Sequence, residues 1–450
     1  MVENNRVLLV NPEETRGRFD FKGIIDDEPL DLEVLYTILI DYNIETYLYD
    51  AIRSKDSLEE ILAFFKPTIV YTNGIVKQVP FLLEYCSRIK KYDSAIKTVI
   101  GGVYAEHNYK HLYHTHLDYV MRSYDPFVMI GLLACFHNNK MDISSLNGLC
   151  YKENQQWREN DIVFFDINKL PEVNRSYFYK NINAFRYLEL KPIAQVRTAY
   201  SCPYDCSFCY RTSLNCGRYV AKDIQKVVTE IKNIACDNIY IVDDDFLFNP
   251  SRLKEFIDLI KQENIQKKYV CYGRTDFILK HKDLIMQLKE IGFYYILVGL
   301  ESITDSHLNH YNKKISADNN AACVKFLNEI HIHCMGMMIV DLDFKRTDFK
   351  NLYKWIKEIN LKHVALSIYT PLPGSELYDN YKNQLITSDL RKWDYVHLVV
   401  KPTHMSVKRY YFHYYILVFK LLRLAKKHGI YDFLDWRKLK KDFLTLLFAK

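Results

Sequence analysis

The chain has little glycine and proline for its length. Its 450 residues include 14 glycines and 12 prolines, whereas both residue types are abundant in low-complexity linkers. No run of about 18 uncharged apolar residues occurs, so we expect no membrane-spanning helix. Internal repeats are also absent. With 49% hydrophobic and 26% charged residues, the composition predicts a folded protein long enough for two or three domains.

The chain also lacks a strong excess of charge of one sign. A net charge of +6 is small for 450 residues, so the composition gives little support to a nucleic-acid-binding role. The eleven cysteines are an odd number, and Met1 leads directly into an apolar strand at Val7–Val10 without a signal-peptide pattern. We therefore expect a cytoplasmic protein with reduced cysteines.

Short apolar strands alternate with amphipathic helices over residues 1–140. The predicted strands are 7–10, 45–48, 68–71, 98–100 and 119–121, and the predicted helices lie near 31–42, 57–65, 79–91 and 106–114. This alternation predicts a doubly wound parallel sheet, with ligands at the carboxyl ends of its strands. Asn11, Asn73, Gly74, Gly101 and Gly102 stand at those ends. Each glycine there makes either a tight turn or room for a ligand, and the turn is the simpler interpretation.

A second α/β unit follows a segment without clear periodicity. Residues 141–190 predict a linker with a hairpin at 149–152 and 162–165. Strands then recur near 193–198, 238–242, 269–272, 294–298, 334–340 and 363–368. Six βα units in succession predict a partial or complete parallel barrel over residues 191–395. Residues 396–450 are aromatic and basic and predict a C-terminal helical extension.

Three cysteines lie close together directly after the first predicted barrel strand. Cys202, Cys206 and Cys209 form a CxxxCxxC run. Three thiolates on one loop can hold three irons of a [4Fe–4S] cluster and leave the fourth iron open for chemistry. The alternative is a structural zinc site with Cys216 as the fourth ligand. Because zinc sites usually combine paired CxxC units, we favour the cluster.

Polar residues follow the next three barrel strands. Asp243-Asp244-Asp245 can accept hydrogen bonds from an ammonium group, although helix capping explains at least one of these carboxylates. Arg274 can hold a carboxylate through two hydrogen bonds or form a surface ion pair. Glu301 and Ser302 offer polar groups to a ribose or an amino acid moiety.

Two further patterns have ordinary structural explanations. His107, His111 and His114 share one helical face, but they have no cysteine and only one carboxylate nearby, so we interpret them as a solvated face. The aromatic run Tyr410–Phe419 is flanked by lysines and arginines. It can lie on an anionic membrane or pack on the barrel, and we favour packing.

With these residues described, the chain resembles B12-binding-domain radical S-adenosylmethionine (radical SAM) proteins over nearly its full length. The cysteine run matches the family motif in full, and Val242–Phe246 and Gly299–Ser302 resemble its acidic strand-end motif and its Gly-x-Glu-Ser contact to SAM. The resemblance implies cluster ligation by Cys202, Cys206 and Cys209 and SAM binding by Phe208, Asp243, Asp244, Arg274, Glu301 and Ser302. It also implies cobalamin binding over Asn11, Asn73, Gly74, Gly101 and Gly102.

A narrower likeness is to the branch that contains the hopanoid C-3 methylases. It rests on Asp341–Phe349, Thr370–Ser375 and residues 394–405, and it implies methylation of an unactivated carbon in an apolar small-molecule or lipid substrate. Many family members have a Gly-Glu-Gly-Glu run where this chain has Arg122–Pro126. The first domain has no Asp-x-His-x-x-Gly run either, so no histidine is assigned as a lower cobalt ligand.

The resemblance implies cleavage of SAM to methionine and a 5′-deoxyadenosyl radical, with an electron from a donor such as flavodoxin or ferredoxin. Cobalamin would then carry the methyl group that is transferred. A second hypothesis keeps the radical without cobalamin, as in a dehydratase, an epimerase or an oxidative rearrangement. A third, a zinc-stabilised nucleic-acid-binding protein, is disfavoured by the modest charge. We expect no nucleic-acid partner, and any membrane contact would be peripheral, through the C-terminal helices.

Overall fold

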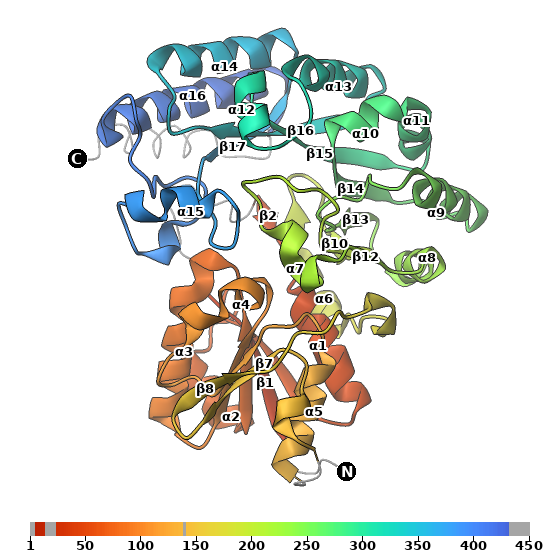
Figure 1. Ribbon diagram of the computed structural model, residues 1–450. Helices are drawn as coiled ribbons and strands as arrows, with labels where there is room; N and C mark the ends of the chain where they lie inside the picture. Colours follow the sequence, from red (N-terminus) through yellow and green to blue (C-terminus); the bar gives the residue numbers. More distant parts are fainter. Residues whose placement is uncertain (1–4, 14–23, 138–140, 432–450) are drawn as a thin grey trace.

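The chain forms two α/β units placed end to end (Figure 1). The computed structural model describes residues 5–13, 24–137 and 141–431. The N-terminal unit contains a seven-stranded sheet, and the C-terminal unit contains a six-stranded sheet that curves into a partial barrel. The predicted fold class is therefore confirmed. Residues 432–450, the end of the predicted C-terminal extension, lie outside the described residues.

The N-terminal sheet has the strand order β3-β1-β4-β5-β6-β7-β8. Its parallel strands are β1 (Arg6–Asn11), β3 (Glu45–Asp50), β4 (Ile69–Asn73), β5 (Lys97–Gly101) and β6 (Tyr119–Met121), and each coincides with a predicted strand. The strand order reverses at β1, which lies between β3 and β4. Such a reversal opens a crevice at the carboxyl ends of the strands, where doubly wound sheets bind their ligands.

Helices cover both faces of this sheet. They are α1 (Leu30–Asp41), α2 (Leu58–Phe65), α3 (Val79–Tyr92) and α5 (Phe127–His137). Val7 and Leu9 of β1 pack with α1 and α5, whereas Leu8 and Val10 pack with α2 and α3, because successive strand residues point to opposite faces. Sequence analysis missed α5, whose almost uniformly apolar sequence has no helical period.

Two local predictions were wrong in their extent. The helix expected over 106–114 is divided into α4 (Val103–Asn108) and a 3-10 turn at Tyr109–Leu112. The hairpin is formed by β7 (Leu149–Glu153) and β8 (Gln156–Glu159), so its second strand comes earlier than residues 162–165. Since β7 pairs antiparallel with β6, the hairpin extends the N-terminal sheet.

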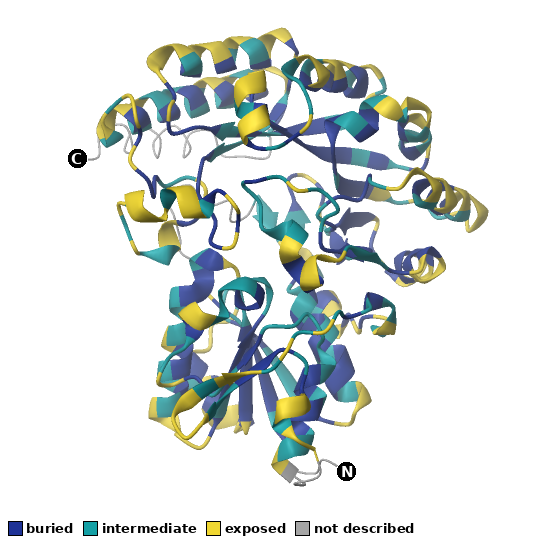
Figure 2. Cartoon of the chain, viewed as in Figure 1, coloured by how far each residue is buried: buried dark blue, intermediate teal, exposed yellow. Residues whose placement is uncertain are grey.

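Six parallel strands form the C-terminal sheet and pair in chain order. They are β10 (Ala194–Val196), β13 (Asn238–Ile241), β14 (Lys268–Gly273), β15 (Phe293–Glu301), β16 (His333–Val340) and β17 (His363–Ile368), and all six were predicted. Their outer face is covered by α8 (Ile224–Asn233), α9 (Pro250–Gln262), α11 (Lys282–Glu290), α13 (Ala317–Glu329) and α14 (Arg346–Glu358). Most residues of the strands are buried, β17 is partly accessible, and the helices expose their outer sides (Figure 2).

The C-terminal helix α16 (Val407–Lys427) packs on the barrel beside α14 and β17. The hydroxyl of Tyr410 donates to the carbonyl oxygens of Val340 and Asp341, both at 2.9 Å, and that of Tyr414 donates to Leu366 O at 3.1 Å. These contacts are the packing that the sequence favoured. Among the described residues, none of the helices combines the length and the apolar character that crossing a bilayer requires.

A buried ion network joins the two units. Arg175 donates to Glu28 of the N-terminal unit at 2.6 Å and to Glu230 of the barrel at 2.8 Å. Glu33 of α1 lies beside this network, and neither of its carboxylate oxygens, both shielded from solvent, has a hydrogen-bond partner within the described part of the chain. Burial, followed by the charge of Glu28, raises the pKa of Glu33 to about 8. Glu33 is therefore protonated in the folded protein at neutral pH.

We expect Glu33→Gln to stabilise the protein at pH 8 and to have little effect at pH 5. The folded-state pKa lies above the ordinary value of 4.5, so stability is lost as the pH rises through this interval, because the unfolded chain releases its proton more readily. Glutamine does not ionise and avoids this loss, for a gain of about 4 kcal/mol at pH 8. Urea unfolding of the variant and the wild type at both pH values measures the difference in the free energy of unfolding.

The matched control is Glu153→Gln, since Glu153 is exposed and pairs with Arg158 at the surface. Its effect should be small at both pH values. An equal effect of Glu33→Gln at pH 5 and pH 8 would contradict the assignment of a neutral Glu33.

Candidate functional site

The loop that carries Cys202, Cys206 and Cys209 is anchored at the barrel mouth. It begins after β11 (Ala199–Tyr200) and leads to α7 (Leu214–Gly217). Ser207 lies at its centre, donating from its N–H to Tyr311 O at 3.1 Å and from its hydroxyl to His310 O at 2.9 Å. The segment 310–314, which follows β15 and α12 (Asp305–His310), therefore holds the cysteine loop in place.

The three thiols do not converge on one point among the described residues. No three cysteine, histidine or acidic side chains of the loop have ligand atoms within 4.8 Å of one another in the described part of the chain. Thiolates bound to one zinc at about 2.3 Å would have to lie closer than this. Cys216, the fourth ligand of the zinc alternative, is exposed, and its thiol lies 3.8 Å from Ile162 O. The placement of these thiols therefore gives the four-cysteine zinc site no support.

Burial keeps two of these cysteines neutral while they hold no metal. It raises the pKa of Cys202 to about 12 and that of Cys209 to about 11. Cys206 has cations beside it instead, because Arg274 Nη1 lies 3.6 Å from its Sγ. A guanidinium at this distance stabilises a thiolate, and the cluster that thiolates hold, by its charge.

The Arg274 guanidinium forms hydrogen bonds and a ring contact with several neighbouring residues. It precedes α10 (Thr275–Lys280) and donates to Lys313 O at 2.7 Å and to Asp276 at 3.0 Å. Its guanidinium carbon lies 3.9 Å from the centre of the Tyr204 ring. The predicted arginine is therefore next to the cysteine loop, with its donors already directed at protein atoms.

A buried ion pair between Glu301 and Lys313 lies beside this arginine. Lys313 Nζ donates to Glu301 Oε1 at 2.9 Å, and both side chains are nearly inaccessible to solvent. The strand pairing shifts between Gly299 and Glu301, and Glu301 has a φ of 56°, as at a β-bulge that redirects a side chain. A Cβ at position 299 would collide with both charged groups. The glycine of the Gly-Leu-Glu-Ser run therefore makes room for the ion pair.

The three aspartates after β13 have different partners. Asp243 accepts hydrogen bonds from the backbone N–H groups of Thr198 and Ala199, at 2.6 and 2.9 Å, and so braces the start of the cysteine loop. Asp244 pairs with Arg211 at 3.3 Å. Asp245 accepts from the backbone N–H of Leu247 with one oxygen.

The second carboxylate oxygen of Asp245 is shielded from solvent and has no hydrogen-bond partner among the described residues. Burial raises the pKa of Asp245 to about 7, and the nearby cations Arg274 and Lys313 oppose the rise. An unpaired buried acceptor of this kind at a barrel mouth can receive an ammonium group. Asp245 is thus the aspartate best suited to a cationic ligand.

The remaining predicted contacts lie around the same mouth. The Phe208 ring meets the Tyr311 ring edge-on, with centroids 5.2 Å apart, and Lys313 Nζ lies 5.8 Å from the Phe208 ring. The Ser302 hydroxyl lies 3.5 Å from His307 Nδ1. Sequence analysis did not find Lys313, which comes from an irregular loop and belongs to no motif. It noted Asp245 but could not tell which aspartate keeps an unpaired oxygen.

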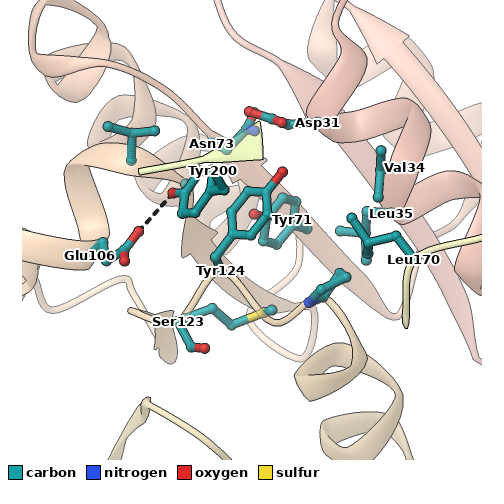
Figure 3. A pocket seen from close by; sticks show the side chains of 14 residues that line it. Asp31, Val34, Leu35, Tyr71, Asn73, Glu106, Ser123, Tyr124, Leu170 and Tyr200 are labelled. Carbon is teal, nitrogen blue, oxygen red and sulfur yellow. Dashed lines mark hydrogen bonds between the residues drawn. The ribbon is translucent and has the colours of Figure 1, made fainter. Parts of the chain in front are cut away.

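The second candidate site is the crevice at the N-terminal sheet (Figure 3). It is lined by α1, by the ends of β4, β5 and β6, and by Tyr200 of the barrel. The rings of Tyr124 and Tyr200 stack across it with centroids 3.5 Å apart, and the Tyr200 hydroxyl donates to Glu106 at 2.8 Å. The cavity that remains has a volume of about 50 Å³. This is room for water but not for the nucleotide tail of a corrinoid.

The polar residues and glycines predicted here have structural roles in this arrangement. Asn11 donates to Asp50 at 3.0 Å. A side chain at Gly101 would collide with the Tyr71 ring, and Gly102 has a φ of 84° and leaves no room for a Cβ beside Asn73. Gly74 lies against Gln78. The strand-end glycines leave space that a ligand could enter, but tyrosine side chains fill this space.

The histidines near α4 do not form a metal site among the described residues. His107 lies within hydrogen-bond distance of the Ser213 hydroxyl, at 3.2 Å, and His111 within 3.3 Å of the Tyr104 hydroxyl. His107 is thereby part of the contact between the two units.

The sequence of the barrel matches a known family model. Residues 196–356 match the model of the radical SAM superfamily. This chain carries a radical SAM domain. The cysteine loop, the Glu301–Lys313 ion pair and Arg274 all belong to that domain.

Curated relatives match parts of the chain. The hopanoid C-3 methylase of Methylococcus capsulatus is 29% identical over 222 residues, which make up 49% of this chain and 43% of that protein. The anaerobic magnesium-protoporphyrin IX monomethyl ester cyclase of Rubrivivax gelatinosus is 21% identical over 363 residues, 78% of this chain and 65% of that protein. The chain therefore spans less than two thirds of the length of either relative.

Solved structures with the same fold cover both units. The cobalamin-dependent radical enzyme OxsB, with aqua-cobalamin and S-adenosylmethionine bound, aligns with a TM-score of 0.72 at 13% identity, over 99% of this chain and 78% of its own. The radical SAM methyltransferase TsrM of Kitasatospora setae, with cobalamin and a [4Fe–4S] cluster bound, aligns with a TM-score of 0.67 at 16% identity, over 90% of this chain and 83% of its own. The radical SAM domain here thus lies on the same kind of N-terminal unit.

Cys206→Ser should remove the iron from anaerobically purified protein, whereas Cys216→Ser should retain it. Cys206 belongs to the anchored loop, and the exposed Cys216 thiol is directed at Ile162 O. Iron and acid-labile sulfide per chain are the measurement. Stoichiometric zinc without sulfide, lost in both variants, would contradict the cluster and support the four-cysteine zinc site.

Proposed function

We propose that the protein is a radical SAM enzyme, with Cys202, Cys206 and Cys209 as the ligands of its [4Fe–4S] cluster. The proposal rests on one observation above all: three cysteines are held on an anchored loop over a barrel mouth, with Arg274 at 3.6 Å from Cys206. When bound, the cluster supplies the electron that divides SAM into methionine and a 5′-deoxyadenosyl radical. An electron donor such as flavodoxin or ferredoxin is part of this proposal.

The chain's own residues would bind and orient SAM around this loop. Asp245 has the unpaired oxygen for the ammonium group. Glu301 and Ser302 offer oxygens to the ribose or the methionine moiety, and Phe208 provides an apolar wall. Asp243 supports the loop from behind, because its carboxylate already accepts from Thr198 and Ala199. Asp244 and Arg274 would set the charge around the site.

The reaction that we propose first is cobalamin-dependent methyl transfer to an unactivated carbon of an apolar small-molecule or lipid substrate. Its support is the fold shared with OxsB and TsrM and the relative named as a hopanoid methylase. Cobalamin would supply the transferred methyl group. Asn73, Gly74, Gly101 and Gly102 would border it, and the Tyr124–Tyr200 stack would have to separate to admit it.

The second candidate is a radical SAM reaction without cobalamin, such as a dehydration or a rearrangement. It is favoured by the crevice itself, since Tyr71, Tyr124 and Tyr200 leave only about 50 Å³ free. Both candidates share the cluster and SAM and differ only in the corrinoid.

Anaerobic reconstitution with iron, sulfide, SAM, a reductant and methylcobalamin distinguishes the candidates. We expect 5′-deoxyadenosine in the reaction mixture for either one. A corrinoid spectrum that stays with the protein through gel filtration supports methyl transfer, whereas complete loss of the corrinoid supports the second candidate. Absence of 5′-deoxyadenosine from iron-loaded protein would refute the proposed function.

We expect Asp245→Asn to weaken SAM binding about tenfold while the iron content is unchanged. The change removes the charge that pairs with the ammonium group and keeps the size of the side chain, and a charge-assisted hydrogen bond of this kind contributes about 1.5 kcal/mol. Equilibrium binding of SAM to the reconstituted protein measures the effect. Asp258→Asn, on the exposed side of α9, is the control. Equal affinity of the two variants would contradict the role of Asp245.

A further inference from the structure

A groove lies between α14 and α16 on the outer side of the barrel, apart from both sites described above. Its volume is about 470 Å³. The lining consists of apolar side chains bordered by cations: Arg346, Phe349 and Lys350 from α14, and Arg409, Phe412, His413, Ile416, Leu417 and Lys420 from α16.

The two helices run in the same direction along the groove. The Phe349 ring contacts the His413 ring, with centroids 5.6 Å apart, and further along both helices Lys420 Nζ lies 5.3 Å from the Tyr353 ring. The N-termini of both helices, with Arg346 and Arg409, are therefore at the same end. The positive ends of two helix dipoles add to the charge of these arginines.

The cations of the groove have no carboxylate partners in the part of the chain that the structure describes. Among the described residues, no acidic side chain forms an ion pair with Arg346, Lys350, Arg409 or Lys420, whereas other helices of the barrel neutralise their lysines. Lys254 pairs with Asp258, for example, and Lys261 with Glu290 at 2.7 Å. The sequence of α16 contains six lysines and arginines and no acidic residue.

His413 shows how closely these charges approach one another. Its pKa is lowered, first by burial and then by Arg409, Arg346 and Lys350, so cations from both helices converge on one side chain. Its Nε2 atom is shielded from solvent and has no hydrogen-bond partner in the described part of the chain. A cluster of like charges around an unsatisfied polar atom is unfavourable unless an anion is bound.

The lining also exposes apolar surface at the same place. The Phe412 side chain remains 51% exposed between the cations, Ile416 beside it is partly accessible, and the buried Leu417 forms the floor of this apolar strip. A free phosphate ion would satisfy the charges but not this strip. An anionic amphiphile satisfies both, because its headgroup is charged and its glycerol and acyl portions are apolar.

We propose that the α14–α16 groove binds the phosphate headgroup of an anionic phospholipid and so holds the protein on a membrane surface. Arg346, Lys350, Arg409 and Lys420 surround the phosphate, and Phe412 enters the boundary between headgroups and acyl chains. Each lysine or arginine near an anionic surface contributes to such binding, and the attraction weakens with added salt. This proposal does not depend on the chemistry at the cysteine loop.

Flotation of the full chain with vesicles tests the groove. Wild-type protein should float with vesicles of phosphatidylcholine and phosphatidylglycerol and stay behind with phosphatidylcholine alone. Combining Lys350→Glu with Lys420→Glu should reduce this binding at least about tenfold. The control combines Lys280→Glu with Lys325→Glu, two exposed lysines on α10 and α13, which changes the net charge by the same amount and should bind like the wild type.

A milder pair, Lys350→Gln with Lys420→Gln, should reduce binding less and in the same direction, which keeps the test valid if the reversed charges prevent folding. Equal binding to both vesicle types, or equal loss in the control pair, would overturn the proposal. So would inorganic phosphate that raises the melting temperature of the wild type without vesicle binding, since the ligand would then be a free anion. A dimer in light scattering that only the groove variants disrupt would assign the groove to a second copy of the chain.

Discussion

The segment that follows α12 controls the geometry of the barrel mouth, and the buried Glu301–Lys313 ion pair fixes that segment. Lys313 donates from its side chain to Glu301, and its carbonyl oxygen accepts from Arg274 at 2.7 Å. Two residues earlier, Tyr311 O accepts from the backbone of Ser207 in the cysteine loop. Removing one partner of a buried pair leaves an uncompensated charge. The ion pair, the arginine and the cysteine loop therefore form one connected unit, and the glycine at position 299 is what allows it.

The sequence predicted most of the fold because its signals are local. Eleven parallel strands could be located from short apolar runs, and the cysteine loop from its spacing, since both depend on residues that are neighbours in the chain. α5 was missed because Phe127–His137 is apolar on all sides and shows no helical period. Lys313 was missed because its partner Glu301 is twelve positions away, on the other side of α12. The role of each aspartate in 243–245 depends on which backbone groups reach it, and this is settled only by tertiary contacts.

The glycines of the N-terminal sheet show why a strand-end pattern alone does not determine a ligand site. A glycine removes a side chain, but the space that it leaves can be taken by the protein. The Tyr71 ring occupies the space beside Gly101, and the stacked rings of Tyr124 and Tyr200 close the crevice from the barrel side. Stacking and burial of such rings stabilise the closed arrangement. A corrinoid would have to replace these contacts with its own. Its net binding free energy would therefore be reduced by the stacking and burial energy of the tyrosine rings that it displaces.

The crevice and the cysteine loop are also mechanically connected, through Glu106 of the N-terminal unit. Its carboxylate accepts from the Tyr200 hydroxyl, at the residue where β11 ends, and from the backbone N–H of Asn215 in α7. These two residues flank the loop that holds all three cysteines. Burial raises the pKa of Glu106 to about 7, and both hydrogen bonds favour its ionised form. Because one side chain holds both ends of the loop, a ligand that displaces Tyr200 from the crevice also changes the anchorage of the cysteines. The crevice of the N-terminal unit and the cysteine loop are therefore joined by a contact that is already present in the closed structure.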